Sequence, residues 1–182
     1  MPDILQQKLN GLHAFAKAMT AVYPEGEFGY VWGAQGELMT DAELLRLEQW
    51  YGPRGSGTDH YYHTDRVRKW LGKKAADCSG LIMYILGLMD MYDVDMNADK
   101  IEDRCSDVSS PEPGDLQFKR SGGREVHVGV YIGDGKTVHC RGTAYGMVTT
   151  EDWEYSWDVT KRYPDIPQWK LIDADARVRE DM

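Results

Sequence analysis

The chain has 182 residues, which is enough for one domain with a substantial hydrophobic core. Its formal net charge of −9 at pH 7 argues against a nucleic-acid partner, which needs a basic patch, and against adhesion to an anionic membrane. Three cysteines without a CxxC pair argue against a disulfide framework, and no apolar run is long enough to span a bilayer.

The first part of the chain is predicted to be helical. Apolar side chains recur at helical spacing over residues 3–22, and the aromatic segment 28–33 is expected to lie against the core. Thr40 or Asp41 is suited to cap a helix that continues to about Trp50. Three leucines of this helix are expected in the core: Leu44, Leu45 and Leu47.

Three more helical segments are predicted before residue 111. A glycine-rich loop at 52–57 precedes a short helix over Thr64–Leu71. A longer helix is predicted from Cys78 to about Met91, because this stretch is almost continuously apolar. One further turn is expected at 99–104.

Strand patterns dominate after residue 111. An Asp-Gly step at Asp134 and Gly135 predicts a tight hairpin between two alternating segments. The acidic tail from Asp173 is expected to be frayed. Helices followed by antiparallel strands predict an α+β fold, with the Cys78 helix packed on the sheet. The strands are expected at 116–119, within 126–140, at 146–150 and at 168–172.

A candidate nucleophile lies at the start of the longest apolar helix. The sequence Asp77-Cys78-Ser79-Gly80 places a thiol in the first helical turn. Backbone N–H groups at a helix N-terminus carry partial positive charge and favour a thiolate. The small Ser-Gly pair is expected to leave room for a substrate carbonyl.

Two histidines on the predicted hairpin supply the partners that such a nucleophile needs. His127 and His139 lie on segments joined by the Asp-Gly turn, so both can face one site. His127 is suited to deprotonate Cys78, and His139 to orient the His127 imidazole.

These motifs, with others in the same order, resemble the NlpC-type cell-wall peptidases. That papain-like family of cysteine enzymes cuts peptidoglycan stem peptides. The matching segments are Tyr30-Val31-Trp32-Gly33, Asp77-Cys78-Ser79-Gly80, Gly114-Asp115-Leu116, His127-Val128-Gly129-Val130-Tyr131-Ile132-Gly133, and His139.

The resemblance implies a role for each motif residue. The implied catalytic residues are Cys78 as nucleophile, His127 as base and His139 as the orienting residue. The residues implied to bind the substrate's free L-alanine amine and scissile carbonyl are Tyr30, Asp77 and Ser79. The implied reaction is hydrolysis of the γ-D-glutamyl–diamino-acid bond through an acyl-enzyme, by a monomer without a cofactor. The implied partner is a stem peptide or muropeptide.

The chain departs from the usual family pattern in one segment. About forty residues separate the Tyr30 motif from Cys78, which resembles a subgroup seen in phage endolysins and prophage-encoded hydrolases. We therefore expect one catalytic domain over 1–182, with 34–74 as an inserted helical segment near the cleft and 173–182 as a flexible tail. The first residues lack a basic segment and a long apolar run. We expect no signal peptide, synthesis in the cytoplasm, and action on the wall after release or delivery.

Two other functions fit parts of the same pattern. A CHAP-like N-acetylmuramoyl-L-alanine amidase also has a Cys before a His, but usually completes its site with a carboxylate or Asn. A catalytically silent phage tail or wall-binding protein would keep the fold without turnover. The complete set Cys78, His127 and His139 favours the peptidase over both.

Other residues receive structural interpretations. His60 and His63 form a His-x-x-His pair beside Asp59, but no third ligand follows at zinc spacing, so a solvated loop without metal is expected. Cys140 should point away from the face of His139 and into the core. The tryptophans are expected mainly in the core, with a binding surface as the alternative: Trp153, Trp157 and Trp169.

Overall fold

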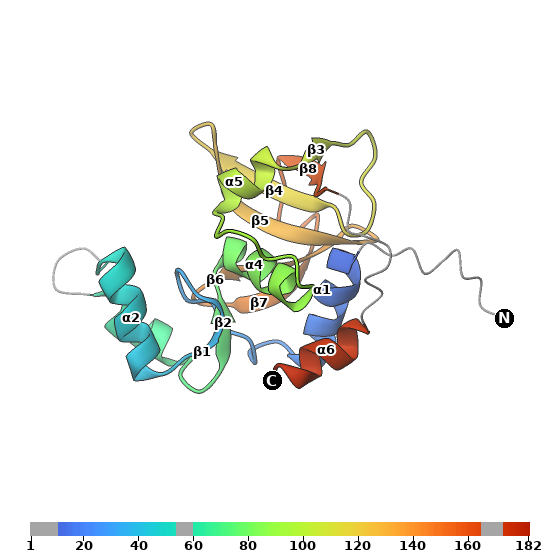
Figure 1. Cartoon of the computed structure of the whole chain (residues 1–182). Coiled ribbons are helices and arrows are strands. Elements are labelled where there is room, and N and C mark those ends of the chain that lie inside the picture. Colours follow the sequence, from blue (N-terminus) through green and yellow to red (C-terminus); the bar gives the residue numbers. More distant parts are fainter. Residues whose placement is uncertain (1–10, 54–59, 165–172) are drawn as a thin grey trace.

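The computed structural model describes residues 11–53, 60–164 and 173–182 (Figure 1). Its main feature is a six-stranded antiparallel sheet with the strand order β3-β8-β4-β5-β6-β7. The strands are β3 (Ser106–Asp107), β4 (Leu116–Ser121), β5 (Arg124–Gly133), β6 (Lys136–Gly142), β7 (Gly146–Glu151) and β8 (Val159–Arg162). The predicted α+β class, with a helix packed on an antiparallel sheet, is confirmed.

Helices and a small second sheet complete the described part of the chain. The helices are α1 (Gly11–Val22), α2 (Asp41–Tyr51), the 3₁₀ helix η2 (Tyr61–His63), α3 (Asp65–Arg68), α4 (Cys78–Leu88), α5 (Ala98–Asp103) and α6 (Ala174–Glu180). Strands β1 (Gln35–Leu38) and β2 (Lys74–Ala76) pair antiparallel. None of the helices in the described ranges is long and apolar enough to cross a membrane.

Helix α4 is the central helix and packs on β5 and β6 (Figure 1). It is apolar on almost every side, and nine of its eleven residues are buried, which is typical of a helix enclosed by the rest of the domain. Asp77 caps its first turn by accepting the Gly80 N–H at 2.7 Å. The helix ends at Leu88 and not near Met91 as expected, because Asp90 has a left-handed backbone (φ 55°).

The β5–β6 hairpin is confirmed. Asp134 and Gly135 both have positive φ, 52° and 67°, as a two-residue turn of type I′ requires. The turn fixes the register that pairs Val130 with Val138, and both side chains are fully buried in the core shared with α4.

The C-terminal residues form a helix where the sequence predicted a frayed segment. Asp173 caps α6 by accepting the Ala176 N–H, and the apolar side chain of Val178 is fully buried. Beyond the helix, Asp181 accepts hydrogen bonds from the Tyr84 hydroxyl at 2.6 Å and the Lys74 ammonium at 2.5 Å. A strand expected at 168–172 and the first part of the helix expected at 3–22 lie outside the described residues. Strand β8, which the sequence did not predict, pairs with β3 and β4.

A second hydrophobic cluster, which we call the second core, is built mostly from residues of the segment 34–74. Its members come from α2 and from the chain before and after this helix. Figure 1 shows α2 well away from the six-stranded sheet. The members are Val31, Ala34, Met39, Leu44, Leu47, Tyr62, Val67, Trp70 and Ala75. This cluster gives the segment its own stabilising contacts.

Two predictions within this segment need correction. Thr40 does cap α2, through its hydroxyl and the Glu43 N–H at 3.1 Å. Leu45, however, is 50% exposed, because the helical period turns it away from the face that buries Leu44 and Leu47. The short helix α3 covers only Asp65–Arg68 and not Thr64–Leu71.

Candidate active site

Cys78 is the first residue of α4 and is 8% exposed. Its Sγ lies beside the backbone of β5, 3.9 Å from the Val126 carbonyl oxygen, to which the thiol donates. The N–H of Val128 also interacts with the sulfur. The sulfur therefore lies beside the backbone on both sides of His127.

Asp77 ties the nucleophile to the segment that carries Tyr30. One carboxylate oxygen caps α4 and also accepts from the Ser79 hydroxyl at 3.1 Å. The other accepts the Gly33 N–H at 2.8 Å. Burial raises the pKa of this carboxyl, and these hydrogen bonds oppose the rise.

Close packing against Ala34 explains why position 80 is a glycine. A Cβ at this position would lie 2.0 Å from the Ala34 carbonyl oxygen. The expectation that the small Ser-Gly pair leaves room for a substrate is therefore wrong for Gly80, since the backbone at Ala34 fills that room. The close approach is needed for the Asp77 N–H to reach the same carbonyl, at 2.9 Å.

The protonation state of the free thiol differs from the expectation. Burial raises the pKa of Cys78 to about 12, and the charge of Asp77 adds to this rise. Backbone N–H groups at the start of α4 lower the pKa but do not offset burial. The free protein therefore holds a neutral thiol at neutral pH, and this thiol would have to lose its proton to a base in order to act as a nucleophile.

His127 and His139 are joined directly. His127 Nε2 lies 2.6 Å from His139 Nδ1, and His139 Nε2 lies 3.0 Å from the Thr150 hydroxyl oxygen. His139 and Thr150 are buried, as is His127 at 7% exposure. Burial lowers the pKa of both imidazoles, so both are neutral near pH 7.

This chain of hydrogen bonds allows one arrangement in which His127 is a base. If His139 Nε2–H donates to Thr150, His139 Nδ1 must accept from His127 Nε2–H. The lone pair of His127 is then on Nδ1, and neither of these two hydrogen bonds uses that nitrogen. In this arrangement Nδ1 is able to accept a proton.

The backbone of β5 and β6 is irregular where the histidines lie. Lys119 pairs with His127 while Arg120 pairs with Glu125, so one residue of β5 is extra. Such a bulge reorients the side chain beside it and is common next to active sites. Opposite, a Cβ on Gly129 would lie 2.9 Å from the Cβ of His139, so the glycine allows β6 to bring His139 close.

Two aromatic rings from the β7–β8 connection cover the histidines. The ring of Trp157 stacks on His127, with centroids 5.6 Å apart and planes 15° apart. Tyr155 packs against His139 at 4.8 Å and against Trp157 at 4.8 Å. These rings remove water from the imidazoles, which explains their lowered pKa values. Within the described residues, the buried Trp157 Nε1 has no hydrogen-bond partner.

Tyr30 lies near Cys78 and Asp77. Its side chain is partly buried against the main core, and burial together with the nearby Cys78 and Asp77 raises its pKa. Hydrogen bonds between Gly29 and residues 74–76 hold this segment beside the start of α4. The structure thus gathers all six residues that the sequence singled out.

The sequence did not reveal three features of this site. They are Thr150, Tyr155, and the role of Trp157 as the ring that covers His127. Thr150 is two residues along β7 from the strand partner of His139, Val148. Strand alternation alone places Thr150 on the face of Val148, but it does not reveal which strand lies beside His139. Trp153 is 79% exposed, and Trp169 lies outside the described residues. Cys140 is fully buried in the core, as predicted.

Solved structures of known proteins share this fold. NlpC1 from Trichomonas vaginalis aligns with a TM-score of 0.52 at 20% identity, over 86% of this chain but 44% of its own. The NlpC/p60 domain of the peptidoglycan hydrolase SagA aligns with a TM-score of 0.52 at 20% identity, over 84% of this chain and 98% of its own. The peptidoglycan hydrolase RipB from Mycobacterium tuberculosis aligns with a TM-score of 0.51 at 17% identity, over 89% of this chain and 67% of its own.

Sequence comparison adds a family assignment. No curated protein sequence matches the chain significantly. The NlpC/P60 family model matches residues 57–162, which is more than half of the chain and includes Cys78, His127 and His139. The chain therefore belongs to the NlpC/P60 family of cysteine peptidases.

Proposed function

We propose that this protein hydrolyses peptidoglycan stem peptides as a cysteine endopeptidase, with Cys78 as nucleophile, His127 as base and His139 as the residue that orients His127. The observation that carries the proposal is the hydrogen-bonded chain from Thr150 through His139 to His127, beside a thiol at the start of α4. SagA and RipB, which share the fold, are named as peptidoglycan hydrolases.

The proposed reaction starts from a neutral thiol and a neutral imidazole. His127 Nδ1 takes the thiol proton as Sγ attacks the substrate carbonyl carbon. The Cys78 N–H and the Tyr30 hydroxyl are the proposed donors to the developing oxyanion. His127 then gives the proton to the leaving amine, and a water molecule, deprotonated by the same imidazole, hydrolyses the thioester.

The proposed bond is the one between γ-D-glutamate and the diamino acid. A substrate cut there presents a free L-alanine ammonium group, which favours a carboxylate and a phenolic oxygen nearby. Asp77, Ser79 and Tyr30 are proposed to provide these groups. Asp77 is held rigidly by the N–H groups of Gly33 and Gly80, so it would meet the ammonium with little reorganisation.

We also propose that residues 34–74 are an insertion that limits which stem peptides enter, as in the endolysin-like subgroup. The second core supports this idea, because it holds α2, η2 and α3 together in a cluster distinct from the one that contains α4. Contacts of Tyr61 and Tyr62 with Trp32 place the segment next to the Tyr30 motif. We propose that such an enzyme reaches the cell wall after release from the cell or delivery by a phage-type system.

The test is digestion of free stem peptides and, alongside them, of sugar-linked muropeptides, followed by product masses. The proposed endopeptidase cuts a free stem peptide into L-alanyl-D-glutamate with a free γ-carboxyl group and a fragment with a new amine on the diamino acid. Cys78→Ala should abolish both, whereas Cys105→Ala, which alters a half-buried thiol just after α5, should not. A sugar-free intact stem peptide would instead identify an amidase. Unchanged masses with a folded protein would identify a binding protein.

A further inference from the structure

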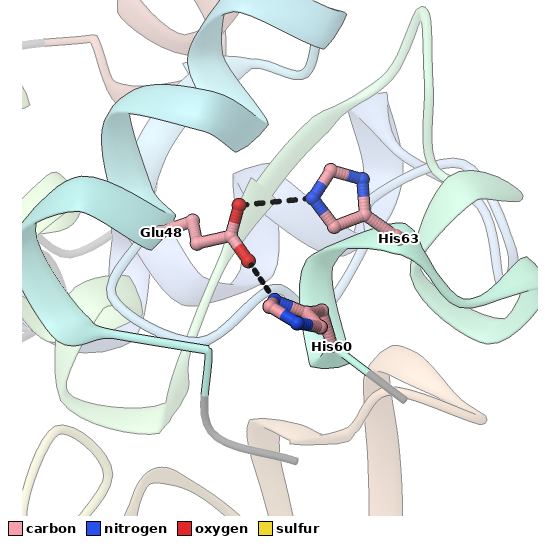
Figure 2. A group of neighbouring side chains, drawn as sticks. All are labelled: Glu48, His60 and His63. Atoms are coloured by element: carbon pink, nitrogen blue, oxygen red, sulfur yellow. Dashed lines mark hydrogen bonds and ion pairs between the residues drawn. The ribbon is translucent and has the colours of Figure 1, made fainter. Parts of the chain in front are cut away.

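Three metal-ligating side chains converge outside the active site, on α2 and η2. Glu48 Oε1 lies 2.8 Å from His60 Nδ1, and Glu48 Oε2 lies 2.9 Å from His63 Nε2 (Figure 2). The sequence offered only the two histidines, because the third residue lies twelve positions before His60. Figure 2 shows one carboxylate facing both rings from the opposite helix.

The local fold explains why the two imidazoles share one side. His60 caps η2 and His63 is its last residue, with the His63 N–H bonded to the His60 carbonyl at 3.0 Å. Side chains three residues apart eclipse each other on a 3₁₀ helix. The ring centroids lie 5.9 Å apart. Glu48, near the end of α2, meets both rings because α2 packs on η2 through the second core.

The donor set matches zinc. Two imidazole nitrogens and one carboxylate oxygen, with water in the fourth position, form a common Zn²⁺ coordination. The three ligand atoms lie within 4.8 Å of one another. Ligands on a tetrahedral zinc are roughly 3.3 Å apart at Zn–N distances of ~2.0–2.1 Å, so small side-chain rotations are enough. The histidine side chains are 50% and 57% exposed, which leaves them accessible to an ion.

We propose that Glu48, His60 and His63 bind one Zn²⁺ ion that fastens α2 to η2. The ion would replace the hydrogen atoms that now lie between the carboxylate and the two rings, and each neutral imidazole would carry its proton on the other nitrogen. This site is separate from the proposed hydrolysis, and its test does not depend on activity.

The consequence of such a site is structural. Between the two histidines, the Tyr61 hydroxyl accepts the Trp32 N–H at 3.2 Å and bonds the Thr143 hydroxyl at 2.8 Å. The Tyr62 hydroxyl donates to the Trp32 carbonyl at 3.1 Å. Zinc at the end of η2 would therefore hold the segment that borders the Tyr30 motif.

The experiment uses tag-free full-length protein stripped with a chelator. Zn²⁺ is titrated in competition with a chromophoric chelator, and thermal unfolding is followed with and without the ion. We expect one equivalent bound and a raised melting temperature. Glu48→Gln and the double variant His60→Gln/His63→Gln should bind at least tenfold more weakly and lose the thermal shift. Glu43→Gln is the matched control, because Glu43 lies on the same helix but pairs with Arg46.

Two controls separate this site from the thiols and from misfolding. Co²⁺ should give tetrahedral d–d bands without a thiolate charge-transfer band, and Cys78→Ala should bind zinc like the parent. Circular dichroism confirms that each variant folds; the two histidines are exposed and Glu48 is partly buried. Zinc affinity that is unchanged in the double variant, or no stoichiometric binding by the parent, would overturn the proposal.

Discussion

His127 Nε2 lies 2.6 Å from His139 Nδ1, so these two nitrogens share one hydrogen bond and the proton can lie on either of them. When His139 Nε2–H donates to Thr150, His139 Nδ1 must accept from His127, and Nδ1 of His127, the proposed base, then carries the lone pair. The same two imidazoles are buried under Tyr155 and Trp157. Orientation and desolvation of the base thus come from the same small group of residues.

Thr150→Val tests the far end of this chain. The change keeps the shape of the side chain but removes the acceptor for His139 Nε2–H, so the His139 tautomer is no longer fixed. Loss of one such hydrogen bond is expected to lower kcat by up to about tenfold and stability by ~1–3 kcal/mol. Muropeptide turnover and urea unfolding measure the two effects. Thr149→Val, at the exposed neighbouring position, should change neither; equal effects of both substitutions would contradict the role of Thr150.

Gly80→Ala tests the contact that fixes the start of α4. The added methyl would lie 2.0 Å from the Ala34 carbonyl oxygen, so the helix or the Tyr30 segment must move. We expect a loss of stability of roughly 1–3 kcal/mol, as for other overpacked cores, together with a loss of activity. Gly87→Ala on the same helix meets no atom within 4 Å and should instead stabilise the protein by up to ~1 kcal/mol. Thermal and urea unfolding of both variants measure these changes in stability. A neutral Gly80→Ala would refute the tight contact.

Much of the architecture follows from local signals that the sequence carries. Asp134-Gly135 predicts the hairpin turn because few other residues accept two positive φ values, and Asp77 predicts the start of α4 because its side chain caps the helix. Helix α6 was missed because its stability depends on distant partners: Val178 is buried in the main core, and Asp181 contacts Tyr84 and Lys74.

The chemistry of the site was predictable only where it depends on residue type and order. Cys78, His127 and His139 follow from motifs along the chain. Thr150 depends on the register between β6 and β7, which shifts near Cys140, and no local pattern shows that shift. The helix start favours a thiolate, but the burial that outweighs this effect is a property of the packed structure.

The pH dependence of kcat/KM follows from the directions of these pKa shifts. The proposed mechanism requires neutral His127, whose pKa is lowered from its ordinary value of ~6.5 by burial, so activity should fall only well below that pH. The Cys78 pKa of about 12 places loss of the neutral thiol far on the alkaline side. We expect a broad plateau through neutral pH in initial rates on a soluble stem peptide. A narrow bell with an acid limb at or above ~6.5 would contradict the buried neutral pair.

Trp157→Ala should move that acid limb toward the ordinary histidine value. The substitution removes the ring stacked on His127 and admits water to both imidazoles, which relieves the desolvation that lowers their pKa values. The sign follows directly: a higher pKa means that His127 is already protonated at mildly acidic pH, so the variant loses activity there first and keeps more of it at pH 8. Trp153→Ala is the matched control, since Trp153 lies in the same connection but is 79% exposed. The measurement is the pH at which kcat/KM falls on the acid side, compared between the two variants and the parent protein. A merely structural role for Trp157 would lower the whole profile evenly and leave the limb in place.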